Sequence, residues 1–336
     1  MATMSMREAI SKTIHDEMAR DPDVLIMGED IVGGHGTPGG TEATGGIWGM
    51  TAGLYDKFGA NRVIDTPISE SCIVGAAAGA ALAGKRAIAE LMFADFVGVC
   101  LDQLYNQIAK FRYMFGGRST CPVTVRITYG AGMNCAAQHS QAVYAMLTSI
   151  PGLKVVLPTT PADAKGLLTS AIRGDDPVMF FEHKTLYGET GEVPDGDHMV
   201  PFGHARLVRE GSDATIVTCG QLVSFAAAAA DRLAKEGIAC DVIDLRTTSP
   251  MDEEAILDSV EATGRLVIAD ESPPRCSLAS DIAGLVANRA FAALHAPIEM
   301  VTAPHTPVPF APELERVYLP SSATIEAAVR KAMAYR

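Results

Sequence analysis

One carboxylate at the start of an apolar segment has the clearest potential for chemistry. Glu70 ends the run Thr-Pro-Ile-Ser-Glu at residues 66–70, and small apolar residues follow it as far as Gly84. No other charged residue appears before Lys85 and Arg86. Burying a carboxylate without a partner is costly, so Glu70 is either held in a dry site for chemical use or exposed at the positive end of a helix. These residues alone leave both interpretations open.

Two glycine-rich patterns come close to nucleotide-binding motifs and fail. The pattern Gly79-x-x-x-x-Gly84-Lys85-Arg86 has Arg86 where a P-loop needs Ser or Thr, and its glycines end a helical segment where a P-loop would open one. The glycine-rich run at residues 33–40 lacks the strand–Gly-x-Gly-x-x-Gly–helix context of a dinucleotide fold, and is interpreted as a mobile loop. No Gly-x-Ser-x-Gly elbow or His-x-x-x-His pair is present. Neither nucleotide binding nor hydrolase chemistry is predicted.

The elements that must position Glu70 alternate between strand-like apolar runs and helical patterns, which is typical of parallel α/β layers. In the first part we expect a helix from Glu70, helices at 6–20, 97–115, 141–147 and 162–173, and strands at 24–27, 63–65, 86–91, 122–128, 154–157 and 178–182. In the second part we expect strands at 213–219, 240–245, 265–269 and 297–301 and helices at 222–236, 253–262, 277–291 and 323–334. The pattern predicts a domain at 1–186, a linker at 187–204 and a smaller α/β domain at 205–336.

Composition narrows the class of protein. With 336 residues the chain exceeds the ~250–300 residues at which single cores stop growing, so two domains are expected. The net charge of −13 disfavours nucleic acid and anionic membranes as partners. No apolar run approaches the ~20 residues that span a bilayer, and the N-terminus has no secretory pattern. Seven cysteines without a Cys-x-x-Cys pair argue against a disulfide framework and a structural zinc site, so we expect a cytoplasmic protein.

Charge is distributed unevenly along the chain. Residues 103–162 contain no Asp or Glu, although they include several Lys and Arg residues and His139. This segment either presents an electropositive wall to an anionic ligand or partner subunit, or is a buried stretch that lacks acids. Both interpretations are compatible with a subunit interface.

Several segments occur in a fixed order along the chain. They are Gly-Glu-Asp at 28–30, Asp-Thr-Pro-Ile-Ser-Glu at 65–70, Glu-Leu-Met-Phe-Ala-Asp-Phe at 90–96, Leu-Asp-Gln at 101–103, Ala-Lys-Phe-Arg-Tyr at 109–113, Gln-His-Ser-Gln at 138–141, Pro-Gly-Leu-Lys-Val-Val at 151–156 and Asp-Leu-Arg-Thr-Thr-Ser-Pro at 244–250. This order resembles the beta subunit of the thiamine-diphosphate-dependent dehydrogenase component of 2-oxo acid dehydrogenase complexes. The group includes pyruvate, branched-chain and acetoin enzymes. The resemblance implies a transketolase-like fold, with an N-terminal pyrimidine-binding parallel-sheet domain and a smaller C-terminal α/β domain.

The resemblance also assigns roles to three side chains. It implies that Glu70 contacts the aminopyrimidine of thiamine diphosphate, where a carboxyl hydrogen bond favours the imino tautomer that can take the thiazolium proton. His139, which alone would be read as a core histidine, matches the histidine of the Gln-His-Ser segment and would shuttle protons to the substrate-derived oxygen or the lipoyl group. Phe96 matches an aromatic residue that packs against the pyrimidine, although core packing is the default for a lone phenylalanine.

The same resemblance implies metals and a partner. Its monovalent-cation site, usually potassium, is made largely of backbone carbonyls and would involve Val123, Ala171, Ile172, Gly174 and Asp176. The Gly-Asp-Gly…Asn motif that binds Mg²⁺ and the diphosphate is missing, since the Asp-Gly-Asp at 195–197 lies in the predicted linker. We therefore expect an alpha subunit to bind Mg²⁺ in an α₂β₂ heterotetramer, with thiamine diphosphate shared across the interface.

The resemblance predicts an oxidoreductase acting on an oxo group. Working only with its alpha subunit, it would cleave a bond next to a carbonyl and pass the acyl group to a lipoyl domain of a dihydrolipoyl transacylase core. The segments at 95–96 and 110–117 look most similar to acetoin- and pyruvate-type members, and the loop at 44–49 looks more acetoin-like than pyruvate-like, so acetoin or pyruvate is favoured over branched-chain acids. A branched-chain 2-oxo acid dehydrogenase beta subunit, half of a split transketolase and a non-catalytic scaffold are the alternatives.

Overall fold

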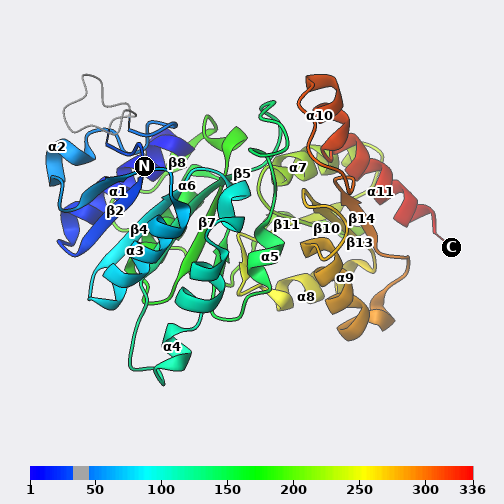
Figure 1. Cartoon of the computed structure of the whole chain (residues 1–336). Coiled ribbons are helices and arrows are strands. Elements are labelled where there is room, and N and C mark those ends of the chain that lie inside the picture. Colours follow the sequence, from blue (N-terminus) through cyan, green and yellow to red (C-terminus); the bar gives the residue numbers. More distant parts are fainter. Residues whose placement is uncertain (33–44, 336) are drawn as a thin grey trace. The chain divides into compact units, whose positions relative to one another are not determined.

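A computed structural model describes residues 1–32 and 45–335, and these residues form two compact units. The first unit contains Met1–Tyr129 and Leu147–Pro201, and the second contains Gly130–Met146 and Phe202–Arg336 (Figure 1). The glycine-rich run at 33–40 lies outside the described residues. The expected limits 1–186, 187–204 and 205–336 stay a prediction, and the contacts add that residues 130–146 pack with the second unit.

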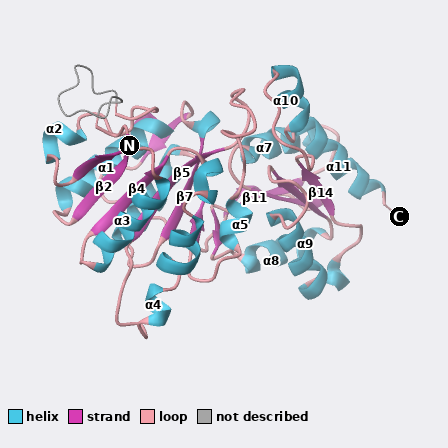
Figure 2. Ribbon diagram, viewed as in Figure 1, coloured by secondary structure: helices cyan, strands magenta, loops and turns pink. Residues whose placement is uncertain are grey.

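A parallel sheet forms the centre of the first unit, with strands in the order β6-β7-β5-β4-β2-β3. The strands are β2 (Val24–Glu29), β3 (Val63–Thr66), β4 (Arg86–Leu91), β5 (Val123–Tyr129), β6 (Lys154–Val156) and β7 (Val178–His183). Every residue of β5 and β7 is buried, as expected for interior strands of a sheet with both faces covered. Figure 2 shows these strands side by side, flanked by helices. Their carboxyl ends share one edge, which is where ligands bind in such sheets.

Four helices in the described part of the first unit contact this sheet: α1 (Met6–Arg20), α2 (Leu54–Phe58), α3 (Glu70–Leu82) and α6 (Pro161–Arg173). The short helix α4 (Phe111–Met114) has no buried residue, η3 (Lys184–Leu186) follows β7, and α5 (Tyr144–Thr148) contains the boundary between the units. A capping box starts α1: the Ser5 hydroxyl accepts from the Glu8 amide at 3.2 Å, and the Glu8 carboxylate accepts from the Ser5 amide at 2.7 Å. The short strands β1 (Ala2–Ser5) and β8 (Thr190–Val193) pair antiparallel, so residues assigned to a linker by sequence include a strand of the first unit.

The expected helix at 97–115 is wrong. This stretch instead holds a 3₁₀ helix η1 (Ala94–Gly98), a π-helix η2 (Gln103–Ile108) and α4. Just before α4, Gly152, at φ +101°, lies so close to Ala109 that a Cβ there would meet the Ala109 carbonyl oxygen at 2.0 Å. Lys110 Nζ also donates to the Pro151 carbonyl at 2.8 Å. These contacts between residues distant in sequence accompany the break in the helical run, and the local sequence does not reveal them.

The second unit is built on its own sheet, with strands in the order β14-β13-β10-β11-β9 and β9 antiparallel to β11. The strands of this sheet are β9 (Arg206–Arg209), β10 (Ala214–Thr218), β11 (Cys240–Asp244), β13 (Leu266–Asp270) and β14 (Glu299–Thr302). The short strand β12 (Thr247–Ser249) also belongs to the residues of this unit but is not part of this sheet. Its helices are α7 (Leu222–Ala234), α8 (Glu253–Thr263), α9 (Leu278–Arg289), η4 (Phe291–Ala293), α10 (Pro312–Tyr318) and α11 (Ser322–Ala334). The α/β alternation predicted for this part is confirmed, and no helix in the described part of the chain is long and apolar enough to cross a membrane.

Candidate active site

Glu70 is the first residue of α3, just beyond the carboxyl end of β3. Only 8% of the residue is exposed. Within residues 1–32 and 45–335, no hydrogen bond or ion pair reaches its carboxylate. A buried carboxylate without a partner lowers the stability of the chain on its own, so this position favours a ligand that offers a proton or a hydrogen bond.

The neighbouring strand ends add further polar groups. In the register of β2 and β3, Gly28 lies opposite Asp65 and Glu29 lies opposite Thr66. Burial raises the pKa of the Glu29 carboxyl, and the negative charges of Asp30, Glu70 and Asp65 raise it further. The hydroxyl oxygen of Thr66 is buried and has no hydrogen-bond partner among the described residues. This edge of the sheet is therefore negatively charged, and its oxygens are available to a ligand with a positive charge or hydrogen-bond donors.

Phe96 lies in η1, near the start of α3. Its ring meets that of Phe93 edge to face, with centroids 5.9 Å apart. Burial raises the pKa of the Cys100 thiol to about 12, and the negative charge of Glu70 contributes to the shift. The Ser71 hydroxyl donates to the Val99 carbonyl at 2.6 Å. These contacts bring the segment after Phe96 against the beginning of α3.

His139 belongs to the second unit, within residues Gly130–Met146. The residue is half-buried, and its backbone N–H donates to the Ala136 carbonyl at 3.5 Å. Glu70 and Phe96 belong to the first unit. The roles predicted for Glu70, Phe96 and His139 stay predictions at this stage.

Sequence reasoning missed a buried ionic cluster in the first unit. Arg126 on β5 donates through Nε to Glu182 Oε1 at 2.7 Å, through Nη2 to Glu182 Oε2 at 2.9 Å and through Nη1 to Glu90 Oε2 at 2.6 Å. The Tyr187 hydroxyl donates to Glu182 Oε2 at 2.9 Å. Burial raises the pKa of Glu90 although Arg126 opposes this. Since β4, β5 and β7 contribute one charge each, only their pairing in the sheet reveals the cluster.

The residues predicted for potassium meet a cation of the chain itself. Arg86 Nη1 donates to the backbone carbonyls of Ile172 at 3.3 Å, Arg173 at 3.1 Å and Gly174 at 2.7 Å, at the carboxyl end of α6. The negative end of a helix dipole favours a positive charge at this place. Two of the predicted carbonyls, those of Ile172 and Gly174, therefore already accept hydrogen bonds from a guanidinium. Among the hydrogen bonds of the described residues, Arg86 donates to neither the Val123 nor the Ala171 carbonyl.

Asp176, also predicted for that site, uses its carboxylate elsewhere. It accepts from Lys154 Nζ at 3.0 Å and pairs with Arg112. Burial alone would raise the pKa of Asp176, but these two hydrogen bonds hold it below its usual value. Arg86 and Asp176 thus show that several charged side chains surround the predicted carbonyls.

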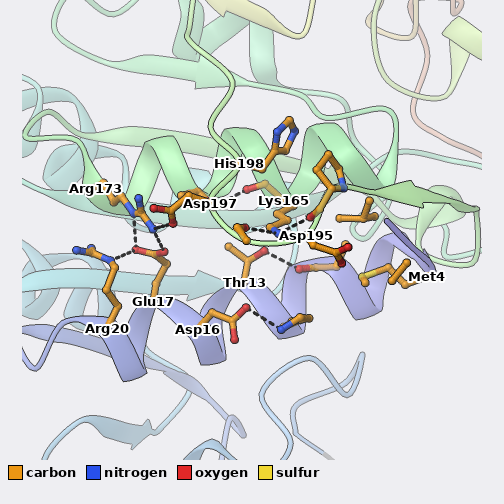
Figure 3. A pocket seen from close by; sticks show the side chains of 17 residues that line it. Met4, Thr13, Asp16, Glu17, Arg20, Lys165, Arg173, Asp195, Asp197 and His198 are labelled. Atoms are coloured by element: carbon orange, nitrogen blue, oxygen red, sulfur yellow. Dashed lines mark hydrogen bonds and ion pairs between the residues drawn. The ribbon is translucent and has the colours of Figure 1, made fainter.

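A cavity of about 460 Å³ lies elsewhere in the first unit, between α1, α6 and the segment after β8 (Figure 3). Ion pairs occupy its walls: Glu17 binds Arg20 at 2.8 Å and Arg173 at 2.7 Å, and Lys12 binds Asp16 at 2.9 Å. None of the predicted site residues lines it. This cavity is therefore separate from the predicted site residues.

Two known domain families match the chain. The transketolase pyrimidine-binding domain matches residues 2–190, and the transketolase C-terminal domain matches residues 203–325. Both agree with the transketolase-like α/β fold expected from the motif order.

Relatives at high identity cover nearly the whole chain. The beta subunit of an acetoin:2,6-dichlorophenolindophenol oxidoreductase from Cupriavidus necator is 58% identical over 330 residues, covering 98% of this chain and 97% of the relative. The corresponding subunit from Bacillus subtilis is 54% identical over 320 residues, with coverage of 95% and 94%. The 2-oxoisovalerate dehydrogenase subunit beta of Bacillus subtilis is 42% identical over 333 residues, with coverage of 98% and 99%.

A solved structure gives the same fold. A split-gene transketolase, described as an inactive beta4 tetramer, superposes with a TM-score of 0.78, covers 99% of both chains and is 24% identical. At that identity the likeness concerns the fold alone.

Proposed function

Because this chain belongs to the family of beta subunits of thiamine-diphosphate-dependent acetoin and 2-oxo acid dehydrogenases, we propose that it forms half of an acetoin-cleaving active site. The observation that carries the proposal is Glu70, a buried carboxylate without a partner among the described residues, at the carboxyl edge of the pyrimidine-domain sheet. The acetoin relatives reach 58% and 54% identity against 42% for the branched-chain relative, which favours acetoin. The split-transketolase alternative is supported only by the likeness in fold to the split-gene transketolase structure.

The residues of the Glu70 site fit thiamine diphosphate. When bound, this cofactor supplies a carbon centre that adds to a carbonyl and accepts the electron pair of the broken bond. In our proposal Glu70 holds a proton between its carboxylate and the pyrimidine ring nitrogen, and the buried Thr66 hydroxyl offers a further polar contact. The negative charges of Glu29 and Asp65 suit the positively charged ring of the cofactor, and Phe96 forms an apolar wall. His139 holds or releases the proton of the substrate-derived oxygen.

The proposal includes an alpha subunit that completes the site. Two large apolar side chains near Glu70 are exposed: Ile68 at 76% and Val99 at 58%. The bond from Ser71 to the Val99 carbonyl places Val99 beside the start of α3. Exposed apolar side chains next to a polar site are typical of surfaces that another chain covers. We propose that the alpha subunit packs here in an α₂β₂ heterotetramer, and that a transacylase core receives the acyl group.

Mg²⁺ is proposed to reside on the alpha subunit. Across residues 1–32 and 45–335, no three His, Cys, Asp or Glu side chains are grouped as a metal site requires. All seven cysteines are unpaired, which supports a proposed location in the reducing cytoplasm.

The test is to co-express this chain with its alpha subunit and assay the complex with thiamine diphosphate and Mg²⁺. Reduction of 2,6-dichlorophenolindophenol is followed with acetoin, pyruvate and 2-oxoisovalerate, and acylation of a lipoyl domain is measured in parallel. We expect the highest rate with acetoin and no rate without the cofactor. The proposal fails if none of these substrates gives thiamine-dependent dye reduction, or if sugar phosphates are the better substrates.

Potassium, if it binds, must share the carbonyls of Ile172 and Gly174 with Arg86. Replacing Arg86 by Met removes the resident cation and leaves these oxygens for another one. We expect Arg86→Met to lower the midpoint of thermal unfolding by roughly 2–4 °C in choline chloride. Potassium chloride at equal ionic strength should restore part of the loss in the variant and change the unsubstituted protein less. An Arg86→Met variant that unfolds at the same temperature in both salts contradicts potassium binding at these carbonyls.

A further inference from the structure

The segment that carries His139 is conformationally strained. Asn134 has φ 54° and Ala136 has φ 60°, in the left-handed region that side chains other than glycine rarely adopt. Asparagine adopts this region more readily than other side chains, but for an alanine it costs on the order of 1–3 kcal/mol and persists only where the surroundings impose it. Ala136 also accepts the backbone N–H of His139, so the strained turn leads directly into the histidine. Something outside the segment must hold it in this shape.

Two buried carboxylates of the second unit bind the backbone of this segment. Glu315 on α10 accepts through Oε1 from the Gly132 N–H at 2.8 Å and through Oε2 from the Asn134 N–H at 2.9 Å. Glu271, directly after β13, accepts from the Ala131 N–H at 2.7 Å. Glu315 is only 3% exposed and Glu271 only 4%. Hydrogen bonds to an ionised acceptor are about twice as strong as neutral ones, and here three of them bind three of the four residues 131–134.

The other end of the segment is anchored as well. The Tyr144 hydroxyl donates to Asp270 Oδ1 at 2.5 Å. The same buried carboxylate accepts from the Ser272 N–H and the Ala279 N–H, both at 2.9 Å. Near the first end, the Ala131 side chain joins a small apolar cluster of the second unit, whose other buried members are Ala303, Val308 and Tyr318. His139 therefore lies between two points that are both fixed to the second unit.

We propose that Glu315 and Glu271 are positioning residues that set the place of His139 through the strained turn at residues 131–136. The proposal rests on the proposed function, in which His139 handles the proton of the substrate-derived oxygen. It assigns to the C-terminal unit a part in catalysis. An ordinary stabilising role would not require the carboxylates to bind the few residues next to the histidine, or to hold left-handed conformations there.

Glu315→Gln tests this in the complex with the alpha subunit. Glutamine keeps the size of the side chain but replaces one carboxylate oxygen by an amide NH₂. One of the two backbone N–H groups that Glu315 binds therefore loses its acceptor. We expect kcat with acetoin to fall by about 10–100-fold while KM stays within about twofold, because small misplacements of a catalytic group are expensive. Hydrogen exchange of a peptide that covers residues 131–140 should become faster. Glu271→Gln should act in the same direction.

Glu326→Gln is the matched control. Glu326 is also a helical and largely buried glutamate of the second unit, but it pairs with Arg232 and Arg330, on α7 and α11. We expect this variant to lose stability without slower turnover and without faster exchange at residues 131–140. If Glu315→Gln behaves like Glu326→Gln in turnover and exchange, the positioning role is overturned.

A double variant separates the positioning role from the proposed function. If Glu315 acts through His139, Glu315→Gln should slow the residual turnover of His139→Asn by less than twofold. If the two substitutions instead lower turnover by factors that multiply in the double variant, Glu315 acts on something other than His139. If His139→Asn alone keeps full turnover, the catalytic role of the histidine fails, whereas the exchange measurement still reports whether Glu315 holds the turn.

Discussion

Glu70→Gln is expected to lower kcat of the assembled enzyme by roughly 10³-fold or more, since removing a proton-transfer group costs about 10²–10⁴-fold. Glutamine fills the same space but cannot exchange a proton with a ring nitrogen. The carboxylate has no partner in the described parts of the chain, so its loss breaks no internal contact. The midpoint of thermal unfolding of the variant without cofactor should therefore stay the same or rise. Activity and stability are expected to move in different directions.

Glu253→Gln is the matched control for this result. Glu253 is the first residue of α8, the same helical position that Glu70 has in α3, and it forms an exposed pair with Arg289. A glutamate that only complements a helix dipole should tolerate the change to glutamine with little loss of activity. If Glu70→Gln also retains activity within about twofold, Glu70 is a helix-dipole residue and the proposed proton relay is wrong.

Arg126→Met is expected to produce the largest loss of stability, on the order of 3–5 kcal/mol, as for buried ion pairs that lose one partner. The change leaves Glu90 and Glu182 in the interior of the first unit without the guanidinium that binds both. It should lower the midpoint of thermal unfolding by roughly 10 °C. The exposed Arg289, which pairs with Glu253 and Glu254, provides the control, and Arg289→Met should change the midpoint far less.

The loss caused by Arg126→Met should depend on pH. Burial already raises the pKa of Glu90 in the folded chain, and removing Arg126 removes the charge that opposes this shift. A carboxyl whose folded-state pKa is raised favours folding below its unfolded pKa, and this contribution is lost as pH rises through the folded-state value. The variant should accordingly lose more stability at pH 8 than at pH 5, measured against the unsubstituted protein at each pH. A deficit that is equal at both pH values contradicts a buried excess of carboxylate charge.

Local pattern was sufficient to predict much of this fold. The helix at 6–20 and the strand at 86–91 have the predicted limits, and a helix does begin at Glu70. These elements have local signals: an N-terminal cap, a short segment made mostly of apolar residues, or a string of small residues. The likeness of motif order supplied the family, which the matching domains and relatives confirm.

Contacts between residues that are far apart in the sequence could not be predicted from local patterns. Arg126 and its two carboxylates meet only because β5 pairs with β4 on one side and β7 on the other. Arg86 reaches the end of α6 across a long stretch of chain, and Glu315 lies far from Gly132 in sequence. Each of these side chains has an unremarkable local context. The predicted helix at 97–115 is broken where Gly152 approaches Ala109, a contact that the local sequence does not show.

The division of the chain into units has a practical meaning for recombination among relatives. Residues 130–146 are encoded within the pyrimidine-binding domain, which matches residues 2–190, yet they pack with the C-terminal unit. A chimaera with a single crossover near residue 200 would combine one parent's histidine turn with the other parent's acceptor carboxylates. Exchanging residues 130–146 together with the C-terminal half keeps the two sets of groups from one parent. Libraries of beta-subunit hybrids should therefore use three crossover points, near residues 130, 146 and 200.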